Sequence, residues 1–402
     1  MYAQTFKTAS KRDESMKTLH RLNKNFSLIL EMSMLIGIYF PYKTSSRINE
    51  ISTKIIRIAL NLFSMYYFIL LSFHSCKSNF DFQFITTALQ FILATFIRLY
   101  LSLNAKRIVE NSNILLNKMS GLSRRYEKTC RNLIITALTI TFSTFPLMEL
   151  LLHLEENLVQ VNIKYMLFDY TASQISLIVF VELLIALRNW IIFVVPYMAI
   201  ILLSFIYYEL GNVVYGLKTK ILDTMNAQFS DDLLQMNRCC YFLSKTMQTV
   251  RRIDGVLTTP MFYVLSFLLI QIMALISIVT KDDKNTPLIV VSLFLAWGVF
   301  ISLIFIVGLA SRIPDNFSGL KNTILTSSIV RQKIMSGKTE SISYIGFVQA
   351  LDNHTENFYV TAMGCIKIEK TVILTMLCAF VSYGVMLNQM ISNNLKLSNG
   401  SL

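Results

Sequence analysis

Polar residues recur along one face of the last long apolar segment of the chain, residues 369–391. At about 100° per helical residue, all of these positions lie within about 40° of one line. They are Thr371, Thr375, Cys378, Ser382 and Gln389. An uncharged polar stripe on an otherwise apolar helix suits a water-lined path for ions. A seam between packed helices is the commoner use of such a stripe, because small side chains allow close approach.

A pore needs more than one such helix, because a single helix cannot enclose a path. Symmetry-related copies of the chain could do so if each donated the same helix to a central axis. The pore interpretation therefore predicts an oligomer. Val385 and Met386 lie between Ser382 and Gln389 and are further pore-lining candidates.

No group of residues has the spacing that catalysis or metal binding requires. The four histidines form no metal-ligand spacing with another histidine, a cysteine or a carboxylate. The 13 glycines are scattered and form no phosphate-binding loop, and the six cysteines have no CxxC spacing. The sequence therefore predicts a protein that is not an enzyme and uses no metal or cofactor.

Composition indicates that the elements around the stripe are membrane helices. Hydrophobic residues make up 54% of the 402 residues and charged residues 15%, whereas soluble domains have about 25% charged residues. Two uncharged runs, residues 285–311 and 371–395, are 27 and 25 residues long, and about 20 residues cross a bilayer. We therefore predict an all-α, multi-pass membrane protein embedded in a lipid bilayer.

Loop charges give the number and orientation of the spans. Seven segments are long and apolar enough to cross, near 55–73, 82–103, 131–153, 175–208, 259–280, 286–311 and 369–391. The loop at 104–131 holds seven Lys or Arg against two Glu, and the loop at 154–173 is acidic. By the positive-inside rule the first is cytoplasmic and the second extracellular. The N-terminus is then inside and the C-terminus outside, which is opposite to G-protein-coupled receptors. The same rule accounts for the net charge of +13, so no nucleic-acid partner is predicted.

A shorter apolar stretch, residues 26–42, is predicted to be a re-entrant or interfacial helix. If it crossed the membrane, the basic residues 1–25 would lie outside. No internal repeat is visible, which disfavours a transporter. The predicted organisation is a cytoplasmic N-terminal segment at 1–54, four spans in 55–208, a cytoplasmic helical loop at 209–258, two spans in 259–311, a cytoplasmic anchor region at 312–368, and the last span with an extracellular tail at 369–402.

The last span also contains a short motif. Insect gustatory receptors end in Thr-Tyr, five apolar residues and Gln-Phe, and this chain resembles them with Ser382-Tyr383 followed by Gln389-Met390. Insect odorant receptors share this architecture and have looser versions of the same ending.

The resemblance extends to two other places in the chain. Ala362 and Gly364 match a pattern that precedes the last span in the gustatory receptors, and residues 35–42 are similar to a stretch before their first span. Chain length, seven spans and inverted orientation agree as well. The resemblance therefore covers the whole chain.

The resemblance implies a ligand-gated, non-selective cation channel in the plasma membrane of sensory neurons. Four subunits, identical or from related receptors, would surround a central pore lined by the last helix of each. Gln389 and Met390 would lie at the extracellular constriction, and permeant cations would pass between them. Its ligand would be a small-molecule tastant, with a bitter-type compound favoured over a sugar because few carboxylates or amides are available. The alternative is an odorant receptor subunit that works with a co-receptor.

The resemblance also implies an outward-opening ligand pocket among the first six spans. Candidates are the polar and aromatic residues toward the outer half of the spans, Tyr66, Tyr67, Glu149, His153, Glu182, Trp190, Gln271 and Trp297. Packing or an interfacial position explains the aromatic residues equally well. Glu182 and Arg188 need partners on other helices or water, because a charge inside a span is costly. Arg98 is expected to extend its charged head toward the inner membrane surface.

Overall fold

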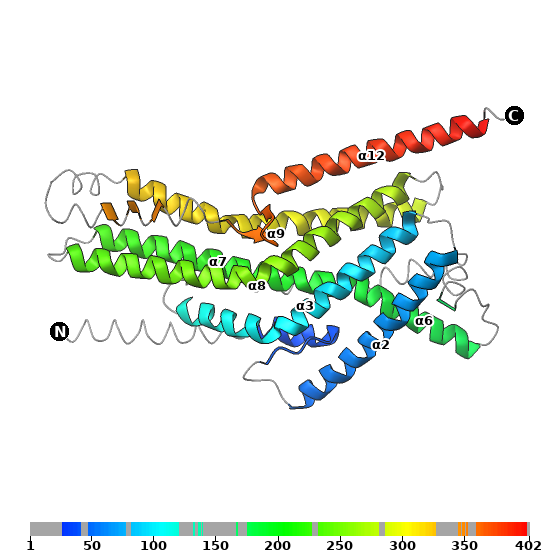
Figure 1. Cartoon of the computed structure of the whole chain (residues 1–402), viewed down its shortest axis with the longest axis horizontal. Coiled ribbons are helices and arrows are strands. Elements are labelled where there is room, and N and C mark those ends of the chain that lie inside the picture. The colour runs from blue at the N-terminus through cyan, green and yellow to red at the C-terminus, as the bar shows by residue number, and fades with distance from the viewer. Residues whose placement is uncertain are drawn as a thin grey trace.

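Long apolar runs form long helices in the structure, a computed structural model of the whole chain (Figure 1). It describes residues 26–41, 47–77, 82–119, 175–226, 232–280, 286–326 and 359–399, with isolated residues at 132, 136, 137, 139, 166, 167, 345, 346, 348, 349, 351 and 352. The elements are η1 (Ser33–Ile36), α2 (Arg47–Lys77), α3 (Phe82–Met119), α6 (Ile175–Asn189), η2 (Trp190–Val194), α7 (Val195–Asn226), α8 (Asp232–Thr280), α9 (Thr286–Thr326), β1 (Thr361–Ala362), β2 (Ile366–Lys367) and α12 (Lys370–Asn399).

Five helices within the described residues are long and apolar enough to cross a membrane. They are Ile48–Ser75, Ile85–Ile114, Leu177–Asp223, Cys239–Ser277 and Leu295–Thr326. They correspond to the first, second, fourth, fifth and sixth predicted spans, and α12 contains the seventh. The third predicted span, 131–153, lies almost wholly outside the described residues. The all-α membrane fold is confirmed, whereas the count of seven spans stays a prediction.

Every α-helix except α6 is longer than the hydrocarbon core of a bilayer is thick. The 49 residues of α8 correspond to about 74 Å, against about 30 Å of hydrocarbon. Figure 1 shows α7, α8 and α9 continuing together toward the end of the molecule that lies opposite the C-terminus. Residues 209–226 and 232–258, within the predicted cytoplasmic loop, continue α7 and α8.

The fourth span contains one turn of π-helix, η2, just before Pro196. Proline has no N–H to donate to the carbonyl of Ile192, and its ring crowds that carbonyl. A local change to wider helical turns absorbs this mismatch without ending the helix. Apolar packing supports the bulge, because Ile191, Ile192 and Val194 are all buried.

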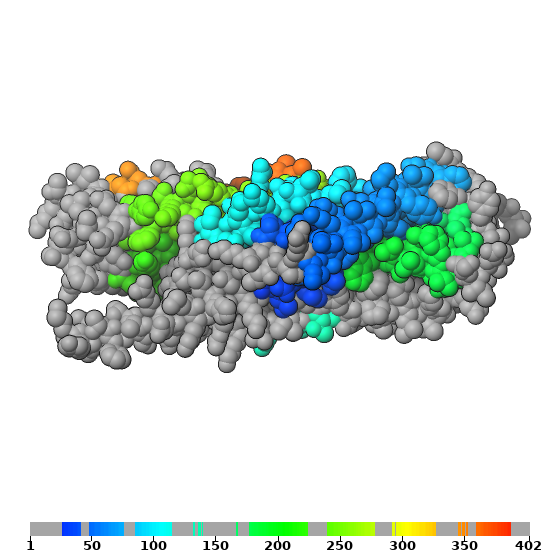
Figure 2. Space-filling view, turned by 90° about the horizontal axis from the view of Figure 1, so that it is seen from below, coloured from blue at the N-terminus to red at the C-terminus, as the bar shows by residue number. Residues whose placement is uncertain are grey.

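The N-terminal stretch of residues 26–40 packs one side against the bundle. Its helical part, Phe26–Ile36, would extend only about 17 Å. The ring of Phe26 stacks on Phe205 of α7 at 5.6 Å, and Figure 2 shows this stretch, in dark blue, against α2. Gly37, with φ of +73°, ends η1 where a Cβ would come within 3.0 Å of the Arg57 backbone. The position therefore requires glycine for both conformation and space.

Arg98 on α3 does not reach the membrane surface, so the expectation of an extended charged head is wrong. Its side chain is only 2% exposed, and its guanidinium donates to Oδ1 of Asn61 on α2 at 2.6 Å. An internal acceptor and the packing of α2 on α3 keep the group inside. The place of Arg98 along its predicted span gives its depth in the membrane, but it does not identify a partner on another helix.

Candidate functional site

The candidate pore helix α12 packs on the bundle with one side only. Its packed residues are Val372, Ile373, Met376, Leu377 and Phe380. Figure 1 shows α12 at the edge of the molecule, next to α9 and α8. Its opposite side is left without a neighbour among the described residues.

That open side contains the polar stripe predicted from the sequence. Thr371, Thr375, Cys378 and Ser382 are all exposed. Leu374, Val381, Val385 and Met386 are exposed beside them. The stripe therefore makes no seam with α8 or α9 within the described chain.

The hydroxyls of the stripe are satisfied by the helix itself. Thr375 Oγ1 donates to the Thr371 carbonyl at 3.0 Å, and Ser382 Oγ donates to the Cys378 carbonyl at 2.8 Å. Such i to i−4 bonds leave the hydroxyl oxygens available as acceptors toward the open side. Gln389 and Met390 lie on α12, but their side chains are outside the described residues.

The motif residues Tyr383 and Gly384 lie on the packed side of α12. A Cβ on Gly384 would meet Cγ2 of Ile276 on α8 at 3.8 Å, which is ordinary contact. Tyr383 is half-buried beside it. Gly384 therefore faces Ile276 of α8, with room for a methyl group between them.

A small hairpin leads into the N-terminal end of α12. Thr361 pairs with Lys367 and Ala362 with Ile366, and the turn between them contains Met363 and Gly364, both at positive φ. Gly364 is favoured there because it adopts φ of +71° without strain. The family-motif residues Ala362 and Gly364 thus form the hairpin.

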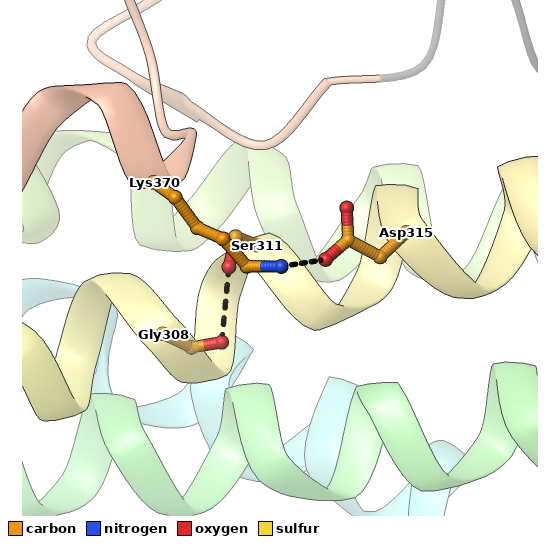
Figure 3. A network of polar contacts seen from close by, with 4 residues as sticks. All are labelled: Gly308, Ser311, Asp315 and Lys370. Carbon is orange, nitrogen blue, oxygen red and sulfur yellow. Dashed lines mark hydrogen bonds and ion pairs between the residues drawn. The ribbon is translucent and has the colours of Figure 1, made fainter.

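The first residue of α12 is held by a charge pair. Lys370 Nζ lies 2.8 Å from Oδ2 of Asp315 on α9, directly after Pro314 within that helix. Figure 3 shows the pair together with the bond from Ser311 Oγ to the Gly308 carbonyl, 3.1 Å, one turn earlier.

The candidate pocket residues of α2 form an aromatic cluster with α3. Tyr67 is 1% exposed and its ring centre lies 4.3 Å from that of Phe91. The Tyr66 hydroxyl donates to the backbone carbonyl of Met166, a residue of the loop predicted to be extracellular. Tyr67 is a packing residue, whereas Tyr66 anchors that loop.

Gln271 on α8 is the most unusual of the pocket candidates. Its side chain is 2% exposed and faces the hydroxyl of Tyr197 on α7. Neither amide atom completes a hydrogen bond of normal geometry with a described residue. A buried amide in this state costs free energy unless another group binds it.

The remaining pocket candidates are not brought together by the described chain. Glu182 and Trp190 are half-buried on α6 and η2, and Trp297 of α9 is 63% exposed. Glu149 and His153 lie outside the described residues. Arg188 donates to Oδ1 of its neighbour Asn189 at 3.1 Å.

Two features of the site were missed in the sequence. The first is the irregular turn η2, which lies beside Pro196 and Tyr197. The available signal for it was Pro196, a proline inside a long apolar run. The hairpin at 361–367 has strands of two residues each, which are too short to show an alternating pattern.

Comparison with known proteins gives the class of fold. None of the protein-family models matches the sequence, and no curated protein matches it. The structure is similar to that of the insect olfactory receptor OR5 from Machilis hrabei, with a TM-score of 0.67 and 12% identity. The match covers 94% of this chain and 99% of the receptor in its complex with eugenol, and 93% and 99% for a second structure of the same receptor. The chain therefore has the fold of an insect olfactory receptor over nearly its whole length.

Proposed function

We propose that the protein is an insect chemoreceptor of the gustatory type: a ligand-gated, non-selective cation channel of four subunits, opened by a small tastant. The observation that carries this proposal is the open polar face of α12 on a chain with the fold of an insect olfactory receptor. A bitter-type compound is favoured over a sugar as the ligand.

The open face suits a shared central pore. Four copies would turn their α12 helices toward one axis, so that Thr375, Cys378 and Ser382 face water and ions rather than lipid. Val385 and Met386 would narrow the path toward Gln389 and Met390. A flexible thioether at 390 would form a soft apolar gate.

Gln271 is the proposed polar contact for the ligand, with Tyr197 beside it. A ligand with one hydrogen-bonding group on an apolar body would complete the bonds of the amide, and a sugar would leave several hydroxyls unpaired. Eugenol, a phenol bound by the structural neighbour, belongs to the favoured class. The other described pocket candidates are proposed to contribute less to ligand binding than Gln271; they are Tyr66, Tyr67, Glu182, Trp190 and Trp297.

One helix connects the ligand contact to the pore helix. Gln271 and Ile276 both lie on α8, and Ile276 contacts α12 at Gly384. A ligand that binds better when α8 is displaced would shift the population toward the open channel. The outer ends of four α12 helices would then separate around Gln389 and Met390.

The test is current recording from cells that express the full chain, with a C-terminal tag labelled on intact cells to verify orientation. Caffeine, sucrose and eugenol are applied to the chain alone and to the chain with an insect odorant co-receptor. We expect cation currents from the chain alone, with caffeine or eugenol more effective than sucrose. Currents that require the co-receptor would support the odorant alternative. A hidden C-terminal tag, or no current from surface-expressed protein under any condition, would overturn the proposal.

A further inference from the structure

The hairpin that leads into α12 is bound to α8 beside Pro260, a proline inside that helix. We propose that Asp254 is a positioning residue for gating: it holds the hairpin to α7 and α8, so that movement of these helices reaches the inner end of the pore helix. This inference rests on the proposed function, because it concerns how the same channel opens.

Asp254 joins three elements. Its side chain is 9% exposed and accepts a hydrogen bond from the backbone N–H of Thr361 in β1. The hydroxyl of Tyr207 on α7, a fully buried residue, donates to Oδ1 of Asp254 at 3.5 Å. Among the described residues no cation pairs with Asp254, and the neighbouring Arg251 and Arg252 are exposed. The carboxylate is thus held by two neutral donors from two different elements.

Two further bonds join α8 to its neighbours close to Pro260. Because Pro260 has no N–H, the Val256 carbonyl loses its helical partner and accepts from the hydroxyl of Tyr100 on α3 at 3.2 Å. The Thr258 carbonyl accepts from the N–H of Met363 in the hairpin turn at 3.1 Å. Residues 254–258 of α8 therefore contact α3, α7 and the hairpin through polar groups.

The hairpin itself is short and well bonded. Cys365 N–H donates to the Ala362 carbonyl at 3.1 Å, and Ile368 N–H donates to the Val360 carbonyl at 2.8 Å. Met363 has φ of +54°, a strained conformation for a residue with a side chain that persists only where surrounding contacts impose it. When Thr361 is displaced, the hairpin should therefore move as a unit and displace Lys370, which lies two residues after Ile368.

Burying a carboxyl group between helices costs free energy of desolvation. Apolar residues of similar volume often give equal or better stability, so a buried hydrogen-bonding group selects one arrangement more than it adds stability. Here that arrangement places the start of α12. This is why the effect of removing Asp254 is expected in the coupling of ligand to current rather than in ligand binding.

The test compares Asp254→Ala, Asp254→Asn and Tyr207→Phe with Asp223→Ala, which removes an exposed carboxylate from α7. Eugenol is the probe, with binding measured on the full chain in lipid nanodiscs and current measured in cells. We expect Asp254→Ala to raise the half-activating concentration about tenfold while eugenol affinity stays within about twofold. Asp254→Asn keeps an acceptor and should lie between Asp254→Ala and the wild type, and Asp223→Ala should behave as the wild type. Unchanged current in Asp254→Ala, or equal losses of affinity and current, would overturn the proposal.

A second measurement separates this inference from the proposed function. Hydrogen exchange of residues 361–368 should increase in Asp254→Ala and Tyr207→Phe and not in Asp223→Ala. Unchanged exchange would show that Asp254 does not hold the hairpin. A wild-type chain that passes no current would overturn the proposed function and the gating role together, and the exchange result would still decide the hairpin contact.

Discussion

Lys370, the first residue of α12, has its ammonium nitrogen 2.8 Å from Oδ2 of Asp315 on α9. Both side chains are largely exposed, at 72% and 54%, so the pair contributes about 0–1 kcal/mol to stability. The pair links the first residue of α12 to α9.

Reversing the charge at 370 should disturb gating more than stability. Lys370→Glu places two carboxylates together, and we expect a several-fold change in the half-activating concentration with unchanged surface expression. The double variant Lys370→Glu, Asp315→Lys should restore the wild-type response. Lys106→Glu, at an exposed pair on α3, is the matched control. A double variant no better than the single one would contradict the prediction.

Side-chain size at Gly384 should control the contact between α12 and α8. Gly384→Ala adds a methyl group 3.8 Å from Ile276 and should leave currents unchanged. Gly384→Leu must move one helix, at about 1–3 kcal/mol of overpacking, and should reduce ligand-evoked current. Current per surface-expressed channel measures the effect. Equal behaviour of the two variants would show that the contact does not matter for opening.

Gln389→Ala and Met390→Ala should change gating or ion selectivity. Both positions lie at the proposed outer constriction, where a change of polarity or size alters the narrowest part of the path. Reversal potentials under sodium, potassium and a large organic cation report selectivity. Leu62→Ala, at a 63% exposed position on α2, is the control. Unchanged currents from both variants would count heavily against a pore along α12.

Replacing Gln271 by Leu should weaken the ligand without destabilising the empty protein. Because neither amide atom completes a bond with a described residue, removing the amide leaves no described partner unpaired, and stability should stay equal or rise. The half-activating concentration should increase about tenfold, as for a lost buried hydrogen bond. Thermal unfolding of the ligand-free protein and concentration–response curves test both parts. Lower stability with an unchanged response would show that the amide is structural.

Asn61→Ala should destabilise the chain by about 1–3 kcal/mol, because it removes the acceptor of a buried guanidinium. The control is Asn104→Ala. The Asn104 side chain donates to the Tyr100 backbone carbonyl within α3, and its loss should cost less. Thermal unfolding of the purified protein in detergent measures the difference. Equal melting temperatures for the two variants would mean that Arg98 is satisfied in another way.

Sequence alone predicted the features that depend on long segments. The five described spans follow from their long apolar runs. The stripe on α12 was visible because polar residues recur at helical spacing at five positions along the helix. The re-entrant or interfacial position of residues 26–42 stays a prediction, argued from its short length and from the basic residues before it.

Features that depend on single residues were not predictable in the same way. Arg98 was given the wrong environment because its acceptor, Asn61, lies on another helix. Asp254 and Tyr207 are far apart in the chain and have no joint pattern. Pro260 indicates a carbonyl without its helical partner, but only the structure shows that α8 continues through it and that the carbonyl of Val256 accepts from Tyr100.

The stacking of Phe26 on Phe205 also constrains the order in which the chain can assemble. Residues 26–40 are synthesised before α7, whose Phe205 stacks on Phe26, and α2, α3 and α6 come between them in the chain. The stretch can therefore dock only after the fourth span has been inserted, and until then its apolar side chains need another cover. Docking of residues 26–40 is thus a late step in the assembly of the bundle, although these residues precede all of its long helices in the chain.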